Sequence, residues 1–120
     1  LFIEIGTTEK EWNDVNLCNS VAQIVVDEMK KIPKSYPVAI CFGGTHYPEK
    51  FTNELIHGEY SLGTVIPKHA LEQIDQSLFS HIIQRNKGAT AALLDWNSMG
   101  KNKQRILEML KETELEVIRL

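Results

Sequence analysis

Cysteine is scarce in this sequence, which contains Cys18 and Cys41 in 120 residues. The two form neither a CxxC motif nor the dense spacing of a disulfide framework, so we expect a reducing, cytoplasmic setting. We interpret both as small core residues. No apolar run reaches the roughly 20 residues that cross a bilayer, and no basic-then-apolar leader opens the chain. We therefore expect neither a membrane-spanning nor a secreted protein.

An excess of basic residues is also missing. The chain has 13 Lys and Arg against 16 Asp and Glu, a net charge of −3, which excludes a polybasic coat for nucleic acid but not a local phosphate contact. No stretch of the sequence carries enough net charge to mark a nucleic-acid face. GxSxG, P-loop, GxGxxG and HExxH motifs are absent as well. These absences remove the commonest hydrolase, nucleotide-binding and zinc-protease interpretations.

What the sequence does contain is enough apolar residues for a core: 42% are hydrophobic and 24% charged. This length predicts one domain, residues 1–120. Short apolar runs alternate with segments of helical periodicity, which predicts a three-layer α/β fold with a mostly parallel sheet flanked by helices. The expected strands are 1–5, 38–42, 89–94 and 116–120, with 60–66 ambiguous between strand and loop. The expected helices are 13–31, 48–56, 70–74, 76–85 and one containing Ile106, Leu107 and Leu110.

Small and polar residues follow three of the expected strands. The first strand ends in Gly6-Thr7-Thr8, the second in Gly43-Gly44-Thr45-His46 and the third in Asp95-Trp96-Asn97. In a parallel sheet these turns share the carboxyl edge, where α/β proteins bind ligands. The second turn is the most informative, because two glycines allow a close approach of the backbone to a ligand. By itself, Gly-Gly after a strand is also typical of an ordinary turn.

His46 is the strongest candidate catalytic residue, since neutral imidazole can act as a base, a donor or a metal ligand near pH 7. The alternative is a loop histidine that satisfies a carbonyl. Thr45 and Tyr47 beside it add a hydroxyl and a phenol. The four histidines lie eleven or twelve residues apart, so the spacing shows no complete zinc site. His57 and His81 are expected in helices without a catalytic role.

Other groups could contact a substrate. The amides around Gly43 to Thr45 are candidates for an oxyanion or substrate contact. Lys68 could hold a phosphate or carboxylate, or it could be a solvated surface lysine. Trp96 could stack on a base or plug the edge of the sheet.

Three stretches, in order, resemble one family. The string CFGGTHYPEKFTNELIHGEYSLGTVIPKHAL, residues 41–71, is similar to the signature region of the archaeal and plant-type D-aminoacyl-tRNA deacylases. FIEIGTTEKEW, residues 2–12, and LLDWNSMGKNKQRILEML, residues 93–110, resemble two further parts of the same family. The resemblance thus covers nearly the whole chain.

The resemblance implies hydrolysis of the ester that joins a D-amino acid to the terminal adenosine of tRNA, a chiral proofreading reaction. It implies a fold similar to peptidyl-tRNA hydrolases and nucleoside phosphorylases, and zinc as a cofactor. By position, Gly43, Gly44, His46 and Tyr47 would line the active crevice, with Lys68 in a second loop. That loop departs from the family pattern, because Thr64 follows Gly63 where a histidine is expected, so a second imidazole role would fall to His69.

Family members are roughly twice as long as this chain. The resemblance therefore implies a carboxy-terminal portion, with most zinc ligands in a missing amino-terminal half and His46 as a single ligand at most. We expect the 120-residue chain to deacylate poorly on its own. Two alternatives stay open: a non-catalytic module that docks the tRNA acceptor end, and a related enzyme such as a peptidyl-tRNA hydrolase or a phosphorylase-like protein.

Overall fold

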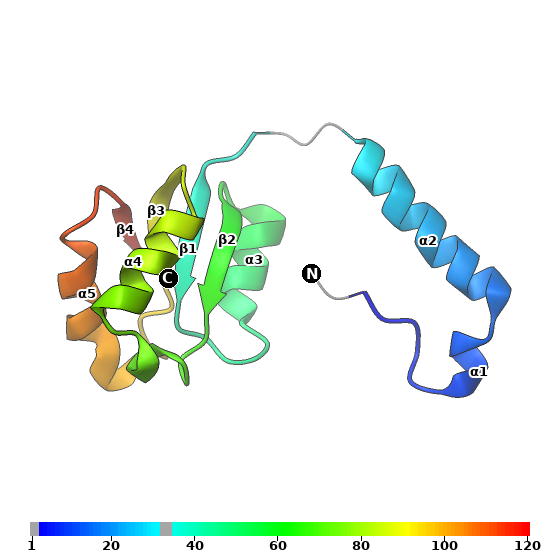
Figure 1. The fold of residues 1–120 in the computed structure, drawn as a ribbon, viewed down its shortest axis with the longest axis horizontal. Helices are drawn as coiled ribbons and strands as arrows, with labels where there is room; N and C mark the ends of the chain where they lie inside the picture. Colours follow the sequence, from blue (N-terminus) through cyan, green and yellow to red (C-terminus); the bar gives the residue numbers. More distant parts are fainter. Residues whose placement is uncertain (1–2, 32–34) are drawn as a thin grey trace. The chain divides into compact units, whose positions relative to one another are not determined.

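The computed structural model describes residues 3–31 and 35–120. The chain divides into two compact units, the first ending at Ser35 and the second spanning Tyr36–Leu120 (Figure 1). The prediction that residues 1–120 form one domain stays a prediction. No helix in the described part of the chain is long and apolar enough to cross a membrane.

The first unit contains two helices, α1 (Glu9–Trp12) and α2 (Val15–Lys30). The strand expected at 1–5 is wrong for residues 3–5, which have no regular structure; residues 1–2 lie outside the described residues. A strand is stabilised by ladder hydrogen bonds to a neighbouring strand. Within the described residues, no strand pairs with 3–5.

Helix α2 begins two residues later than the expected range 13–31. The carboxylate of Asp14 accepts a hydrogen bond of 3.0 Å from the backbone N–H of Leu17 and caps the helix. Apolar residues of α2 fall on one stripe of the helix: Leu17, Val21, Ile24 and Val25. Even so, no residue of α2 is buried. Ile24, at the centre of that stripe, is 62% exposed. The apolar periodicity therefore predicts the helix correctly but not its packing.

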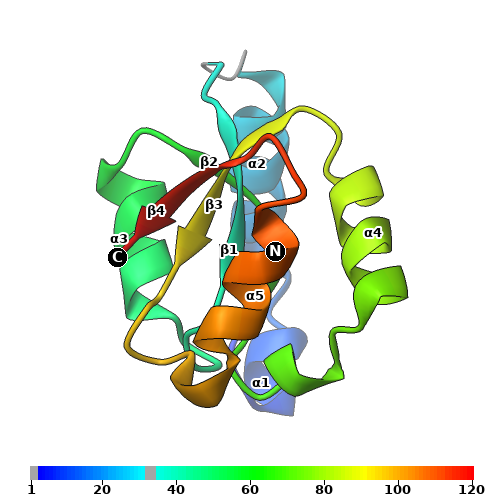
Figure 2. The same ribbon diagram turned by 90° about the vertical axis from the view of Figure 1, so that its left-hand side faces the viewer.

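The second unit is built on a four-stranded sheet in the order β2-β1-β3-β4. Its strands are β1 (Val38–Phe42), β2 (Ser61–Ile66), β3 (Ala89–Leu94) and β4 (Glu116–Arg119). All three strand pairs are parallel (Figure 2). The predicted parallel sheet is confirmed, and the ambiguous segment at 60–66 is an edge strand.

Helices cover both faces of this sheet, which confirms the three-layer fold. Ile40 and Phe42 point to the face covered by α4 (Gln76–Arg85) and α5 (Lys103–Leu110). Ala39 and Cys41 point to the opposite face, where Phe51 of α3 (Glu49–His57) packs. Figures 1 and 2 show α3 on one side of the sheet and α4 and α5 on the other. Two short 3-10 helices, Leu71–Gln73 and Gly100–Asn102, precede α4 and α5.

Because the strands are parallel, their carboxyl ends meet at one edge of the sheet. We call this edge the carboxyl edge: it comprises the last residue of each strand, the segment that follows it and the first turn of the helices that come next. The opposite edge, with the last helical turns, the segments leading into the strands and the first residue of each strand, is the amino edge. Three of the residue groups singled out in the sequence, those after β1, β2 and β3, lie at the carboxyl edge.

Candidate functional site

The turn after β1 has a backbone shape that requires glycine. Gly43 and Gly44 have φ angles of +105° and +79°, which other L-residues rarely adopt. The space is also closed: a Cβ on Gly43 would lie 2.6 Å from Oγ of Ser98. The two glycines therefore let the chain turn sharply against the segment that follows β3.

Hydrogen bonds tie this turn to both neighbouring segments. The N–H of Gly43 donates to the carbonyl of Ile66 at 2.8 Å, and the N–H of Lys68 donates to the carbonyl of Gly44 at 2.9 Å. The N–H of Gly44 donates to Oγ of Ser98 at 2.6 Å. The loops after β1, β2 and β3 are thus connected by hydrogen bonds, and Gly44 bonds to both of the other loops.

These bonds limit what the turn can offer a substrate. The amide hydrogens of Gly43 and Gly44 are both used inside the fold. The amide of Thr45 donates no hydrogen bond to the described residues, so it is the member of the predicted set that is available to an oxyanion. The substrate-binding role expected of the two glycines stays a prediction.

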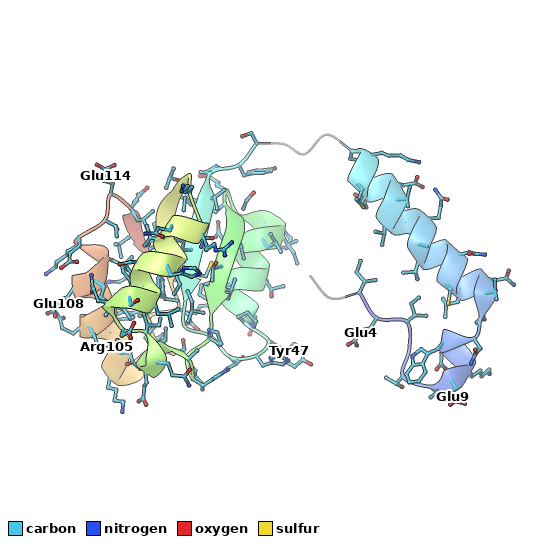
Figure 3. All side chains as sticks on the ribbon, in the orientation of Figure 1. Glu4, Glu9, Tyr47, Arg105, Glu108 and Glu114 are labelled. Carbon is cyan, nitrogen blue, oxygen red and sulfur yellow. The ribbon has the colours of Figure 1, made fainter. Side chains whose placement is uncertain are left out.

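The three residues after the turn are exposed. Oγ1 of Thr45 donates to the carbonyl of Tyr47 at 2.9 Å. The rings of His46 and Tyr47 meet edge to face, with centroids 4.9 Å apart, and Tyr47 is 84% exposed. Figure 3 shows Tyr47 projecting away from the second unit. The imidazole, the phenol and the hydroxyl therefore stand together at the carboxyl edge and are open to a ligand.

Two pockets of the second unit lie away from His46. One of about 390 Å³ is lined by α3 residues including Lys50 and His57, and another of about 250 Å³ lies between α4 and Thr113. His46 lines neither of them and faces solvent in this chain. A site at His46 is therefore an open surface as far as the described residues build it.

The structure separates the remaining candidates. Lys68 and His69 follow β2, are exposed, and share the carboxyl edge with His46. His57 ends α3 and so lies toward the amino edge, while His81 is exposed within α4. The expected lack of a catalytic role for His57 and His81 stays a prediction.

The sequence did not predict two residues, Ser98 and Lys50, that anchor the loops of the carboxyl edge. Oγ of Ser98 accepts from Gly44 and also donates to the carbonyl of Asp95 at 2.9 Å. Nζ of Lys50 lies 3.2 Å from a carboxylate oxygen of Asp95 and donates to the carbonyl of Leu120 at 2.6 Å. The signal available for Ser98 was its place in the polar turn after a buried strand. Lys50 gave none, because its partners are far away in sequence.

Trp96, in the same turn as Asp95, is half-buried and packs against cations. The guanidinium of Arg119 lies 3.9 Å from the centroid of its ring, and Nζ of Lys103 lies 5.0 Å from it. Both distances are within the range of cation–π attraction. Trp96 thus contacts two positively charged side chains at the carboxyl edge.

A zinc site needs three or four ligands. The residues that the structure describes contain no group of three or more His, Cys, Asp and Glu side chains able to hold a metal ion. The donor set of this part of the chain does not fit zinc by itself, and His46 could supply one ligand. The role of zinc stays a prediction.

Comparison with known proteins agrees with this fold. The crystal structure of AF0625, a conserved protein of unknown function, matches with a TM-score of 0.77 and 23% sequence identity; the match covers 95% of this chain and 40% of that one. This similarity supports the α/β fold alone.

Curated relatives share much more sequence. D-aminoacyl-tRNA deacylase of Cenarchaeum symbiosum is 53% identical over 118 residues, which cover 98% of this chain and 46% of the relative. The protein of the same name from Methanosarcina mazei is 33% identical over 121 residues, covering 99% and 39%. The chain thus spans less than half the length of these two relatives. The family model described as D-aminoacyl-tRNA deacylase matches residues 1–118, and the chain therefore belongs to the D-aminoacyl-tRNA deacylase family.

Proposed function

We propose that this chain forms part of an enzyme that hydrolyses the ester between a D-amino acid and the terminal adenosine of tRNA. The observation that carries the proposal is the family match, which extends over residues 1–118 and includes the segments after β1, β2 and β3. The products would be the free D-amino acid and tRNA. We place this reaction in the cytoplasm, in keeping with two cysteines that form no disulfide.

Hydrolysis of the ester needs a base and hydrogen-bond donors. An aminoacyl ester is activated, so a positioned water can attack its carbonyl carbon once a base removes a proton from that water. We assign this role to the exposed imidazole of His46. The water oxygen bonds to the carbonyl carbon, the bond to the ribose oxygen breaks, and the imidazolium returns its proton to that ribose oxygen.

The tetrahedral intermediate carries a negative oxygen that needs hydrogen-bond donors. The amide of Thr45 and the hydroxyl of Tyr47 are the nearest groups in sequence to His46 that could supply them. Gly43 and Gly44 would place these groups, since the turn they form is fixed by Ser98 and by the backbone of Lys68. The side chain of Lys68 would meet a phosphate near the acceptor end.

Zinc enters this proposal through the family resemblance. Bound zinc would lower the pKa of a water molecule and polarise a carbonyl. The described residues bring no three ligands together, so we derive no step through the metal. A zinc role for this chain would rest on His46 as one ligand among others.

A second candidate function is a docking module for the tRNA acceptor end that performs no chemistry itself. The exposed position of His46, which lines neither of the two pockets described above, favours it. Hydrolysis of D- and L-aminoacyl-tRNA separates the two candidates when this chain is assayed beside the Cenarchaeum symbiosum relative. We expect D-selective hydrolysis that is weaker in the 120-residue chain. Binding of tRNA without hydrolysis in any form of the protein would support the docking module instead.

A further inference from the structure

Charge is divided unequally between the two edges of the second unit. The carboxyl edge holds six basic residues and four acidic ones. The amino edge holds three basic residues and six acidic ones. The basic residues of the carboxyl edge are Lys50, Lys68, Lys101, Lys103, Arg105 and Arg119, and the acidic residues of the amino edge are Glu54, Glu59, Glu108, Glu112, Glu114 and Glu116. In Figure 3, Arg105 and Tyr47 lie toward the carboxyl edge and Glu114 lies at the amino edge.

Three of the six basic residues of the carboxyl edge form ion pairs or hydrogen bonds within the second unit. Lys50 pairs with Asp95, and Lys101 pairs with Glu72. Arg105 donates to the carbonyls of Leu71 and Ile74. Within the described residues, Lys68, Lys103 and Arg119 form no ion pair, so their charges are available to a ligand.

Two of these three are held in place by one ring. Trp96 has Arg119 at 3.9 Å and Lys103 at 5.0 Å from its centroid. Cation–π attraction compensates for bringing two like charges together and leaves their hydrogen-bond donors free. Donors that form no ion pair with a carboxylate of the described residues suit phosphate oxygens.

The cations are connected to the candidate active turn. Trp96 follows Asp95, whose N–H donates to the carbonyl of Phe42 at 3.0 Å. Ser98, two residues further on, accepts from Gly44. Lys68 joins the same turn through its own N–H. Lys68 and the segment that carries Trp96 are therefore hydrogen-bonded to the turn that precedes His46.

We propose that Lys68, Lys103 and Arg119 bind backbone phosphates of the tRNA acceptor stem and so bring its terminal ester to the turn at Gly43–His46. The inference rests on the proposed function for the identity of the RNA. The acidic amino edge would repel the same backbone, which orients the approach. Three neutralised phosphates in an otherwise acidic unit predict a salt dependence of modest slope, roughly −2 to −3 in the logarithm of the association constant against log salt.

Binding of uncharged tRNA tests the inference without requiring hydrolysis. The intact protein is titrated with tRNA at several salt concentrations, as wild type, as Lys103→Gln/Arg119→Gln and as Lys68→Gln. Lys87→Gln/Lys111→Gln at the amino edge is the matched control for charge. We expect the first double variant to weaken binding about tenfold or more and to make the slope shallower by about 2, because two phosphates would no longer be neutralised. The control should bind within twofold of wild type.

Rates on a phosphate-free ester separate this inference from the proposed function. Hydrolysis of D-aminoacyl-adenosine should be unchanged in the Lys103/Arg119 variant, while KM for D-aminoacyl-tRNA rises. Retained tRNA binding in both carboxyl-edge variants, or equal loss in the amino-edge control, would overturn the inference, as would stronger competition by polyglutamate than by RNA. Dependence of tRNA binding on these cations in a protein that hydrolyses no ester would overturn only the proposed function. If the Lys103/Arg119 variant unfolds, Lys68→Gln tests the inference instead, because Lys68 is exposed. We expect this variant to bind tRNA about threefold more weakly than wild type.

Discussion

The N–H of Gly44 donates a hydrogen bond of 2.6 Å to Oγ of Ser98, a residue 54 positions further along the chain. The same hydroxyl donates to the carbonyl of Asp95 at 2.9 Å. One serine thus fixes the turn after β1 to the turn after β3. Because His46 lies two residues beyond Gly44, the position of the imidazole depends on this bond.

Removing the hydroxyl should loosen that turn. In Ser98→Ala the amide of Gly44 loses its acceptor in a half-buried place, which should cost about 1–3 kcal/mol of the free energy of unfolding. Urea denaturation measures this loss. Ser80→Ala is the control, because Oγ of Ser80 bonds within the exposed surface of α4 and donates to the carbonyl of Gln76. Equal stability of the two variants would show that Ser98 is not an anchor.

Two glycines with similar φ angles allow the cost of backbone strain to be measured separately from the cost of steric overlap. Gly43 and Gly88 have φ angles of +105° and +92°. A Cβ on Gly88 would meet nothing within 4 Å, whereas on Gly43 it would lie 2.6 Å from Oγ of Ser98 and 3.0 Å from the carbonyl oxygen of Asp95.

Gly88→Ala should therefore lose about 1–2 kcal/mol from its backbone conformation alone. Gly43→Ala should lose this amount and roughly 1–3 kcal/mol more, because the overlapping atoms must move. Thermal or urea unfolding of both variants gives the difference. A smaller loss at Gly43 than at Gly88 would contradict the close contact between the two turns.

The elements that the sequence predicted best are those with strong local signals. The expected strands 38–42 and 89–94 and the helix 76–85 match β1, β3 and α4 at both ends. Buried parallel strands show as continuous apolar runs, and Asp75 and Asn86 bound α4. The apolar run at 1–5 gave the same local signal, yet residues 3–5 are not a strand. Pairing, which decides whether such a run is a strand, is not local.

The sequence indicated which residues to consider for the candidate site, but not the contacts that join them. His46, Lys68 and the glycines could be found because they follow strands that share an edge. The bond from Gly44 to Ser98 and the ion pair of Lys50 with Asp95 join distant positions, so no pattern along the chain reveals them. The charge difference between the edges is hidden in the same way. Helices α3 and α5 each carry charges to both edges, so the net charge of successive segments averages the two.

The two cysteines should differ in reactivity. Burial raises the pKa of the Cys41 thiol to about 12, and the side chain is 0% exposed, whereas Cys18 is half-buried rather than a core residue as expected. Because the thiolate is the reactive form, iodoacetamide at pH 8 should modify Cys18 and spare Cys41 until the protein unfolds. Mass spectrometry of the alkylated peptides measures this.

The same pKa gives a pH dependence of stability. The unfolded thiol ionises near the ordinary value of 9.0, while the folded one keeps its proton up to about 12. The folded state thus holds more protons in this interval, and the contribution of Cys41 to stability should fall as the pH rises above 9. Cys41→Ala should remove this contribution. Rapid alkylation of Cys41 in the folded protein would contradict its burial.

Zinc content tests the ligand count. Since the described residues bring no three ligands together, the 120-residue chain should retain far less than one zinc per chain after dialysis against a weak chelator. Elemental analysis gives the ratio. One tightly held zinc per chain, lost in His46→Ala, would show that the described residues do not account for the site.

The turnover number of His46→Ala on D-aminoacyl-tRNA, measured in the intact protein, tests the central claim most directly. We expect kcat to fall by about 100-fold or more, as for the loss of an acid–base group. Stability should change little, because His46 is an exposed loop residue. His57→Ala and His81→Ala should keep kcat within a few-fold of wild type. A near-wild-type kcat in His46→Ala, or a loss explained by unfolding, would contradict the assignment and direct the test to His69.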